Sequence, residues 1–336
     1  MLWPITASAQ GFAGLGTDVD GFSSPQRPAQ FDFPIDHGPH DDYRIEWWYL
    51  TANLEGLDGT PYGLQWTLFR SALTSDGGKG WSSPQLWMGH AAVTTPDAHF
   101  VTERLARGGI GQAGVQADPF EAWIDDWQLV GPDFATLTMT ASGPDFAYDM
   151  VLNSDGPLVF HGDEGYSLKS AEGQASYYYS QPFYAIEGTL ILPTGTIEVA
   201  GDAWLDREWS SQPLSDNQTG WDWFSLSFED GKLMGFRLRQ TDGSDYTSAT
   251  WIDPDGTTTS YSNSAFEADP VAISNIGGRD VPTTWNVRLA DRGVDVEVTA
   301  INPQAWMNTS VPYWEGPITV QGSHTGRGYL EMTGYD

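Results

Sequence analysis

Carboxylates and tryptophans concentrate in the stretch WLDREWSSQPLSDNQTGWDWF, residues 204–224. Asp206 and Glu208 are two residues apart, so on a β-strand they lie on the same face. Two neighbouring carboxylates raise the pKa of one of them, which suits an acid/base pair. We therefore expect Asp206 and Glu208 to be catalytic candidates beside an apolar, ligand-binding wall formed by Trp209, Trp221 and Trp223.

The same stretch also has a purely structural interpretation. Arg207 lies between the two acids, and Asp222 could be a turn or pairing residue. Asp222 also lies between two tryptophans of the expected wall, so it is a candidate for ligand binding as well. Both interpretations stay open at the level of the sequence.

A further carboxylate begins the stretch EWWYLTANL, residues 46–54. Trp, Tyr and Thr favour strands, and alternation along a strand points Trp47 and Trp48 in opposite directions. One indole then faces the interior of a barrel, and the other faces the packing between that barrel and its partner. Glu46 shares a face with Trp48, at the mouth of the barrel or inside it. We therefore expect Glu46 to be a second acid/base candidate and Trp48 to belong to the apolar wall.

The histidines are few and follow no firm catalytic spacing. His90 follows WMG at the start of a strand, where it is either an acid/base candidate facing a barrel interior or a hydrogen-bonded core histidine. His161 precedes GDEGYSLK, a loop that could cap a barrel mouth and contribute to ligand binding. His37 and His40 lie in DHGPHDD and could bind a cation with the nearby carboxylates, but HExxH spacing is absent and we expect no metal.

The tyrosines of SYYYS, residues 176–180, are expected to pack at a domain interface. Ligand sites favour such interfaces, so Tyr178 is a candidate for lining a crevice there. No GxSxG nucleophile elbow occurs, so no serine motif supports hydrolysis. No βαβ rhythm and no Walker loop occurs either, and we expect no cofactor.

Composition limits the classes of function. Aromatic residues make up 13% of the 336 residues, and with 38 glycines they indicate a β-rich chain with many turns. Cysteine is absent, which excludes disulfides, thiolate metal sites and cysteine nucleophiles. The formal net charge is -30, and the lysines are only Lys79, Lys169 and Lys232. Such a field repels nucleic acid and anionic membranes, so we expect neither as a partner.

Short apolar and aromatic runs alternate with turn signals from about residue 31 onward. Runs such as TLTMTAS and VDVEVTAI alternate with period 2, and Asp-Gly and Pro-Asp turns separate many runs, which predicts hairpins in an all-β fold. The best helix candidate is short, at residues 101–106. Residues 1–30 are rich in Gly, Ser and Pro and are expected to form an irregular N-terminal segment.

The N-terminal residues bear on localisation. No run of about 18 apolar residues exists, so no transmembrane segment is predicted. ASAQ, residues 7–10, is typical of a small-residue cleavage site without its apolar region. We therefore expect an exported protein of the periplasm or cell envelope, with an ordinary disordered start as the alternative.

Two segments share one pattern. Residues 46–70 and residues 222–239 each run from an acid through aromatics, a strand, a Gly-containing turn and a second strand to an arginine. This favours two similar β units with a boundary near residues 185–190. Closing a sheet into a barrel removes its edges and can enclose a pocket. We expect two antiparallel β-barrels packed against each other, at residues 31–187 and 188–336.

Six motifs follow one another along about residues 30–336: FPIDHGPHDDYRIEWWYLTANL, MGHAAVTTPD, YSLKSAEGQASYYYSQP, GDAWLDREWSSQPL, GWDWFSLSFEDGKLMGFRLR and GYLEMTGY. In this order they resemble the AttH-like family, which is related to carotenoid 1,2-hydratase and often labelled "predicted secreted hydrolase". The resemblance implies two lipocalin-like barrels in tandem. It also implies relatives that include hydratases acting on apolar polyenes and fungal enzymes that shape polyketide-derived ligands.

The relation to a hydratase implies a specific chemistry. Adding water to a trisubstituted alkene requires a carboxylic acid, held neutral in an apolar pocket, that protonates carbon. Aromatic faces can stabilise the resulting tertiary cation, and a second polar group must place the water. The chain departs from the hydratase in having LDREW where that enzyme has a His-rich, HDHNW-like segment. Asp206 and Trp209 keep an acid and an aromatic in that segment.

We therefore expect a protein that binds an apolar small molecule, such as a terpenoid, polyene or lipid, and transforms it by hydration or isomerisation. The alternatives are a carrier without catalysis and a glycan-binding or glycan-acting module, because tryptophans with acid pairs also suit sugars. A closed apolar cavity with a buried acid would favour the first function. A cavity without buried ionisable groups would favour the second, and an open, Trp-lined groove the third. The oligomeric state does not follow from the sequence.

Overall fold

Two antiparallel sheets make up the structure, a computed structural model that describes residues 20–335. The strands of the 13-stranded first sheet are β1 (Ile45–Gly56), β2 (Pro61–Ala72), β3 (Gln85–Thr94), β4 (His99–Arg107), β5 (Ala113–Gln116), β6 (Phe120–Ile124), β7 (Trp127–Gly131), β8 (Thr136–Ser142), β9 (Ala147–Ser154), β10 (Val159–Phe160), β11 (Tyr166–Leu168), β12 (Ala175–Leu192) and β13 (Gly195–Ser210).

The strands of the 10-stranded second sheet are β14 (Gln218–Phe228), β15 (Lys232–Gln240), β16 (Asp245–Ile252), β17 (Thr258–Tyr261), β18 (Phe266–Ile276), β19 (Arg279–Leu289), β20 (Val294–Ala300), β21 (Trp306–Met307), β22 (Tyr313–Gly322) and β23 (Gly326–Thr333). Helical structure within residues 20–335 is limited to the 3-10 turns η2 (Ile35–His37), η3 (Gly80–Ser82) and η4 (Ala290–Arg292). None of these described helices is long and apolar enough to cross a membrane.

The first sheet curls into a nearly closed barrel. Its strands run in the order β4-β3-β2-β1-β13-β12-β9-β8-β7-β6-β5, with β10 and β11 also pairing with β12. Side chains hold the two ends of this path together: Arg104 of β4 lies over the ring of Trp127 at 4.5 Å and forms an ion pair with Asp126. Large aromatic residues such as Trp48 and Trp66 fill the interior.

The second sheet forms a half barrel in the order β17-β16-β15-β14-β23-β22-β20-β19-β18, with β21 pairing with β22. Its core contains Phe224, Trp285 and Trp314, all without exposed surface. The prediction of an all-β fold with two lipocalin-like barrels in tandem is therefore confirmed.

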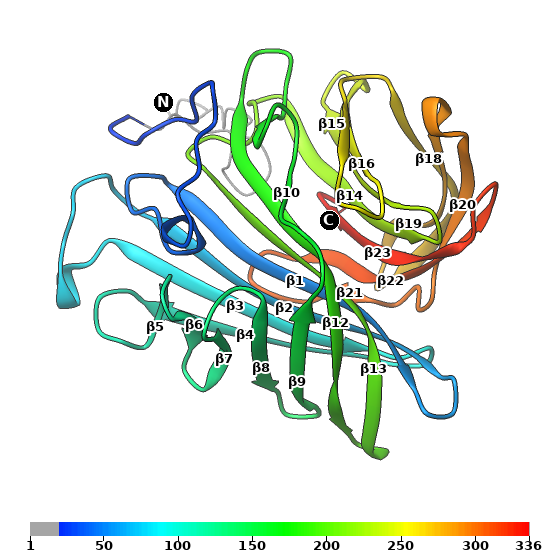
Figure 1. Cartoon of the computed structure of the whole chain (residues 1–336), viewed down its shortest axis with the longest axis horizontal. Helices are drawn as coiled ribbons and strands as arrows, with labels where there is room; N and C mark the ends of the chain where they lie inside the picture. Colours follow the sequence, from blue (N-terminus) through cyan, green and yellow to red (C-terminus); the bar gives the residue numbers. More distant parts are fainter. Residues whose placement is uncertain (1–19, 336) are drawn as a thin grey trace, which may run out of the picture.

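Strands β1, β12 and β13 lie between the interior of the first barrel and the second sheet, which approaches with β14 and β23 (Figure 1). Trp48 is buried in the core of the first barrel, whereas Trp47 and Tyr49 face the second sheet. On β14, Phe224 likewise points into the second core and Trp223 points back toward the first sheet. Trp47 and Trp48 therefore point in opposite directions, as the sequence predicted, and both faces of β1 are covered.

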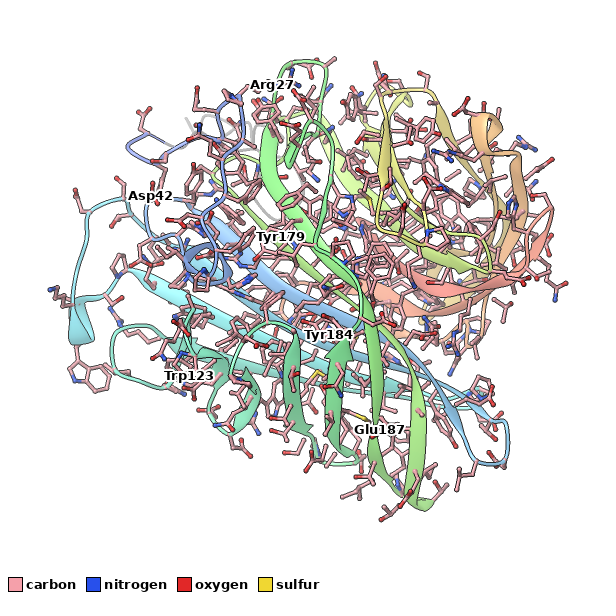
Figure 2. All side chains as sticks on the ribbon, in the orientation of Figure 1. Arg27, Asp42, Trp123, Tyr179, Tyr184 and Glu187 are labelled. Atoms are coloured by element: carbon pink, nitrogen blue, oxygen red, sulfur yellow. The ribbon has the colours of Figure 1, made fainter. Side chains whose placement is uncertain are left out.

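The chain passes from the first sheet to the second between Ser210 and Gln218. Tyr179 and Tyr184 of β12 point into the first barrel, and Glu187 farther along the same strand is exposed (Figure 2). β13 then pairs with both β12 and β1. The boundary that we predicted between residues 187 and 188 falls inside β12 and is wrong, because the first barrel needs β13 to bridge β12 and β1.

Two other predictions concern local structure. The helix predicted at residues 101–106 is wrong, because this segment forms part of β4 and pairs with β3 over its whole length. The tertiary pairing outweighs the local helix propensity. Residues 20–30 form no strand, and the cleavage-like ASAQ lies outside the described residues.

The first barrel buries an acid between two arginines. Glu46 lies directly opposite Arg70 in the register of β1 and β2, and it forms ion pairs with Arg70 and Arg207. None of the three side chains has exposed surface. Burial alone would raise the pKa of Glu46, but Arg207 and Arg70 outweigh it and hold the pKa well below its usual range.

The second barrel repeats this arrangement. Asp222 of β14 lies opposite Arg237 of β15 and forms ion pairs with Arg237 and Arg239. The acid and the arginine that begin and end each repeated segment are therefore partners across a hairpin. This pairing gives a physical reason for the shared pattern of residues 46–70 and 222–239.

Replacing Glu46 with Gln is expected to destabilise the protein by about 3–5 kcal/mol, because two buried arginines lose their counter-charge. Urea unfolding followed by tryptophan fluorescence measures this loss. The control is Glu267→Gln, since Glu267 forms only an exposed pair with Arg288 and should leave the unfolding midpoint unchanged. Equal midpoints for Glu46→Gln and the native protein would contradict a structural role for this ion cluster.

Candidate functional site

A cavity of about 230 Å³ lies between the two sheets. Its walls come from β1, β2, β3, β12 and β13 of the first sheet and from β14, β15, β22 and β23 of the second. It is larger than an engineered apolar cavity of roughly 150 Å³ that binds benzene. Apolar side chains form most of the lining, chiefly Ile45, Trp47, Phe69, Met88, Leu214, Trp221, Trp223, Phe236, Leu238 and Val311.

Asp206 of β13 lies at the centre of a hydrogen-bonded cluster in this cavity. Its direct neighbours in the ladders are Tyr49 of β1 and Ser180 of β12. The Tyr178 hydroxyl donates to Oδ2 at 2.6 Å, the Trp204 indole donates to Oδ1 at 2.6 Å, and the Ser180 hydroxyl also donates to Oδ1. Burial raises the pKa of Asp206 to about 7, although these donors favour the charged form.

Glu331 of β23 reaches the same cavity from the second sheet. It lies opposite Trp223 of β14 and Glu315 of β22, and the Trp221 indole donates to its Oε1. Burial raises the pKa of Glu331 to about 7; the Trp221 indole opposes this shift, and the nearby Asp206 adds to it. One carboxyl from each sheet therefore titrates near neutral pH, where a group can both give and take a proton.

Glu208 has a cation beside it. Lys169 Nζ lies 2.8 Å from Glu208 Oε1, and the Ser176 hydroxyl donates to the same oxygen. The Lys169 ammonium also lies 4.8 Å from the centre of the Tyr178 ring and 4.3 Å from that of Phe236. Asp206 and Glu208 share the cavity face of β13, as predicted from their spacing. The ion pair with Lys169 nevertheless compensates the charge of Glu208, whereas Asp206 and Glu331 have no such partner among the described residues.

The cavity brings together the predicted site residues Asp206, Glu208, His90, Tyr178, Trp221 and Trp223. Glu46, Trp48 and Trp209 lie on the opposite face of the first sheet, inside its barrel. There the Arg207 guanidinium lies 3.8 Å from the centre of the Trp48 ring and 4.9 Å from that of Trp209. Trp48 and Trp209 therefore flank the arginine that is paired with Glu46, and none of the three residues lines the cavity.

Two further predicted residues also lie away from the cavity lining. Asp222 faces the opposite side of β14, where it pairs with arginines. His161 packs behind Tyr178, with 4.2 Å between the ring centres, and its Nε2 lies 2.6 Å from the Ser180 hydroxyl. His161 therefore contacts Tyr178 and Ser180, two of the residues that donate to Asp206, and is not part of the cavity lining.

The histidines of the DHGPHDD stretch are held by other side chains. His40 lies 3.2 Å from both Asp36 and Glu46, and His37 Nδ1 lies 2.7 Å from the Tyr179 hydroxyl. Over residues 20–335, no group of three or more His, Asp or Glu side chains is arranged to hold a metal ion.

Sequence reasoning missed several residues of the cavity, chiefly Glu331, Lys169 and Tyr49. Glu331 lies in GYLEMTGY between Leu330 and Met332, both without exposed surface. A lone acid in an apolar strand was therefore a usable signal. Lys169 is one of only three lysines in the chain, but nothing in its spacing relates it to Glu208.

The matches to known proteins extend over almost the whole chain. A family model described as AttH-like matches residues 24–335. A crystal structure of a candidate AttH from Nitrosomonas europaea has 31% sequence identity and a TM-score of 0.85, covering 94% of this chain and 99% of that one. No curated protein sequence matches.

Two more distant solved structures share the fold. Kievitone hydratase from Nectria haematococca has 14% identity and a TM-score of 0.68, with 93% of this chain and 96% of that chain covered. CghA, solved with Sch210972, has 13% identity and a TM-score of 0.53, with 87% and 88% covered.

The raised pKa of Asp206 predicts a specific dependence of stability on pH. The folded protein keeps this proton up to about pH 7, whereas an unfolded Asp with its usual pKa of 3.8 releases it earlier. The stabilising effect is therefore complete below the unfolded pKa and is lost as pH rises toward 7. Between pH 4 and pH 8 the native protein should lose on the order of 4 kcal/mol relative to Asp206→Asn.

Urea unfolding at several pH values measures the difference between the two proteins. Tyr148→Phe is the control, because Tyr148 is a buried tyrosine that donates to the Gln65 carbonyl at 3.0 Å and makes no hydrogen bond to Asp206. This variant should follow the native pH dependence. A pH-independent difference between native protein and Asp206→Asn would contradict the raised pKa.

Proposed function

The chain belongs to the AttH-like family, and we propose that it binds an apolar small molecule between its two barrels and transforms it by acid/base chemistry. The observation that carries this proposal is that the carboxyls of Asp206 and Glu331 line the same, mostly apolar cavity. Each carboxyl has a pKa of about 7, raised by burial. A carboxylic acid that stays neutral in an apolar site is what protonation of a carbon–carbon double bond requires.

The two carboxyls have different surroundings, which assigns their roles. Three donors surround Asp206 and favour its carboxylate, so Asp206 is the base. Glu331 accepts one indole N–H from Trp221 and is the acid. Lys169 and Glu208 neutralise each other at the cavity wall and keep a polar end in an otherwise apolar space.

In the proposed reaction, the neutral carboxyl of Glu331 gives its proton to one carbon of the double bond. The π electrons form the new C–H bond and leave a tertiary cation on the other carbon. The indole faces of Trp47 and Trp223 line the cavity and can stabilise that cation. Hydration is completed when water adds to the cation and Asp206 takes the water proton. Isomerisation is completed when Asp206 removes a proton from a neighbouring carbon instead.

The other candidate functions have less support. A carrier needs an apolar cavity but has no use for two carboxyls that are costly to bury without a cation. A glycan site would present polar groups along an open groove, whereas apolar side chains form most of this lining.

The structural neighbours add support at the level of the fold. One is named a hydratase of kievitone, and the other was solved with the small molecule Sch210972. We propose a small-molecule site with hydratase or isomerase chemistry in this chain. The word hydratase in one name and the bound small molecule in the other structure agree with this proposal. Export to the periplasm or cell envelope also stays a prediction, because ASAQ lies outside the described residues.

Carbon protonation leaves a signature that does not require the product to be known in advance. The protein is incubated in D₂O with a panel of terpenoids and polyenes that carry trisubstituted double bonds. Mass spectrometry should find deuterium on carbon in hydrated or isomerised products. Asp206→Asn and Glu331→Gln should each lower this incorporation by about 10²–10⁴-fold, the usual contribution of a general acid or base.

The matched control is Glu46→Asp, a carboxyl change that lies outside the cavity and keeps the charge beside Arg70 and Arg207. Incorporation that persists in both cavity variants would contradict the proposed roles. Tight binding of a panel member without any deuterium incorporation in the native protein would favour the carrier.

A further inference from the structure

One part of the cavity wall is an ion pair. Lys169 and Glu208 both line the cavity, and their side chains are only 9% and 7% exposed. Apolar side chains form most of the remaining lining, so a ligand that fills this space must place some of its atoms beside the ammonium and the carboxylate. Charged groups lose free energy when hydrocarbon replaces their hydrogen-bond partners. The pair therefore limits the chemistry of that end of the ligand.

Two backbone hydrogen bonds fix the position of Lys169. The residue follows β11, and its N–H donates to the Gln174 carbonyl at 2.7 Å. Its own carbonyl accepts the side-chain amide of Gln218 from β14, also at 2.7 Å. The ammonium then lies over the rings of Tyr178 and Phe236. Because the chain holds this cation in place before any ligand arrives, little side-chain entropy is lost when one binds.

The ion pair leaves hydrogen-bonding capacity unused. An ammonium has three donors, and the one ionic or hydrogen-bonding partner of Lys169 Nζ within residues 20–335 is Oε1 of Glu208, at 2.8 Å. That oxygen also accepts from the Ser176 hydroxyl. The other oxygen, Oε2, accepts no hydrogen bond from any residue that the structure describes. The pair therefore offers both a donor and an acceptor to a molecule in the cavity.

The ion cluster inside the first barrel shows what a purely structural arrangement looks like. Both oxygens of Glu46 are occupied there, Oε1 by Arg70 and Oε2 by Arg207. None of these three residues lines the cavity. Lys169 and Glu208 differ on both counts, because they line the cavity and keep a donor and an acceptor available.

We propose that Lys169 and Glu208 bind a neutral hydroxyl group, so that the preferred substrate is an apolar alkene that carries an alcohol or a phenol. The hydroxyl oxygen accepts from the Lys169 ammonium, and its O–H donates to Oε2 of Glu208. A carbonyl or an ether uses the lysine alone, and a hydrocarbon uses neither group. A carboxylate would lie beside Glu208 and an amine beside Lys169, so repulsion between like charges disfavours both.

The place of the pair on β13 also limits the distance from the hydroxyl to the double bond. This step rests on the proposed function, which puts the double bond beside Asp206 and Glu331. Asp206 and Glu208 are two residues apart on one face of the strand, so their α-carbons are roughly 7 Å apart. The Tyr178 ring lies beside the Lys169 ammonium, and the Tyr178 hydroxyl donates to Asp206. A hydroxyl bound at this end is therefore a few carbon atoms from the double bond and orients it for reaction.

Four ligands with one carbon skeleton test the native protein without any turnover. They are geraniol, its methyl ether, geranate and the corresponding hydrocarbon without oxygen. The change in tryptophan fluorescence on titration measures each Kd, since Trp47, Trp221 and Trp223 line the cavity. At neutral pH geraniol should bind more tightly than geranate, which brings a second anion to Glu208. Tighter binding of geranate than of geraniol would overturn the proposal.

The double substitution of Lys169→Met with Glu208→Gln removes both charges together and leaves no buried charge unpaired. The preference for geraniol over the hydrocarbon, taken as the ratio of their Kd values, should fall by about 10–100-fold, because hydrogen bonds to charged groups are lost. Comparing this ratio between proteins cancels the different hydration of the two ligands. Glu208→Gln alone should lower the preference for geraniol over its methyl ether, because only geraniol donates to Glu208.

The matched control is Lys232→Met. Lys232 is another partly buried lysine beside an aromatic ring, 5.8 Å from the centre of Phe183, and it does not line the cavity. Its variant should keep the native ratios. Native ratios in both Glu208→Gln and the double variant would overturn the role of the ion pair and leave the proposed function standing, because the cavity would still bind apolar ligands. Failure of the native protein to bind any of the four ligands would instead contradict the proposed function itself.

Discussion

The face-to-face packing of the two sheets is the constraint on which the site depends. β1 and β13 bury one face in the first barrel and the other against β14 and β23. Asp206 and Glu331 lie within this contact on opposing sheets, and both line the cavity there. Neither has a cation among the described residues to compensate its charge, so burial raises the pKa of each carboxyl. A gap in the same packing leaves the mostly apolar cavity that both carboxyls line.

The acids of the barrel interiors and of the cavity divide into two groups by their partners. Glu46, Asp222 and Glu208 each lie beside an arginine or lysine, in pairs that explain their burial by charge compensation. Asp206 and Glu331 accept hydrogen bonds from tyrosine, serine or tryptophan donors instead. The carboxyl oxygens of Glu315 have no hydrogen-bond partner among the described residues. For the first group, pairing with a cation is a sufficient structural reason for burial. The second group is costly for stability and therefore the more informative one about function.

Period-2 alternation predicted the all-β fold and the two faces of residues 46–54, and the resemblance to the AttH-like family implied the two barrels in tandem. The alternation also placed Asp206 and Glu208 on one face of a strand. The sequence did not distinguish residues of the cavity from residues of the barrel interior. Trp48 and Trp209 have the residue type of a ligand-binding wall, but in the structure they pack against Arg207. Glu331 was marked only as a lone acid in an apolar strand, because it shares the cavity with Asp206 across two sheets and no local spacing encodes that arrangement. The boundary failed because β12 and β13 are longer than their apolar runs suggest.

The most direct test is the titration of the two cavity carboxyls by ¹³C NMR, with Asp206→Asn and Glu331→Gln to assign the signals. We predict that both midpoints lie near pH 7, far above the usual values for Asp and Glu of about 4. Filling the cavity with a small apolar probe should raise them further, because the probe removes the remaining solvent around each carboxyl. Midpoints near 4 for both carboxyls, with or without the probe, would contradict the central claim that this cavity is built to hold acids neutral.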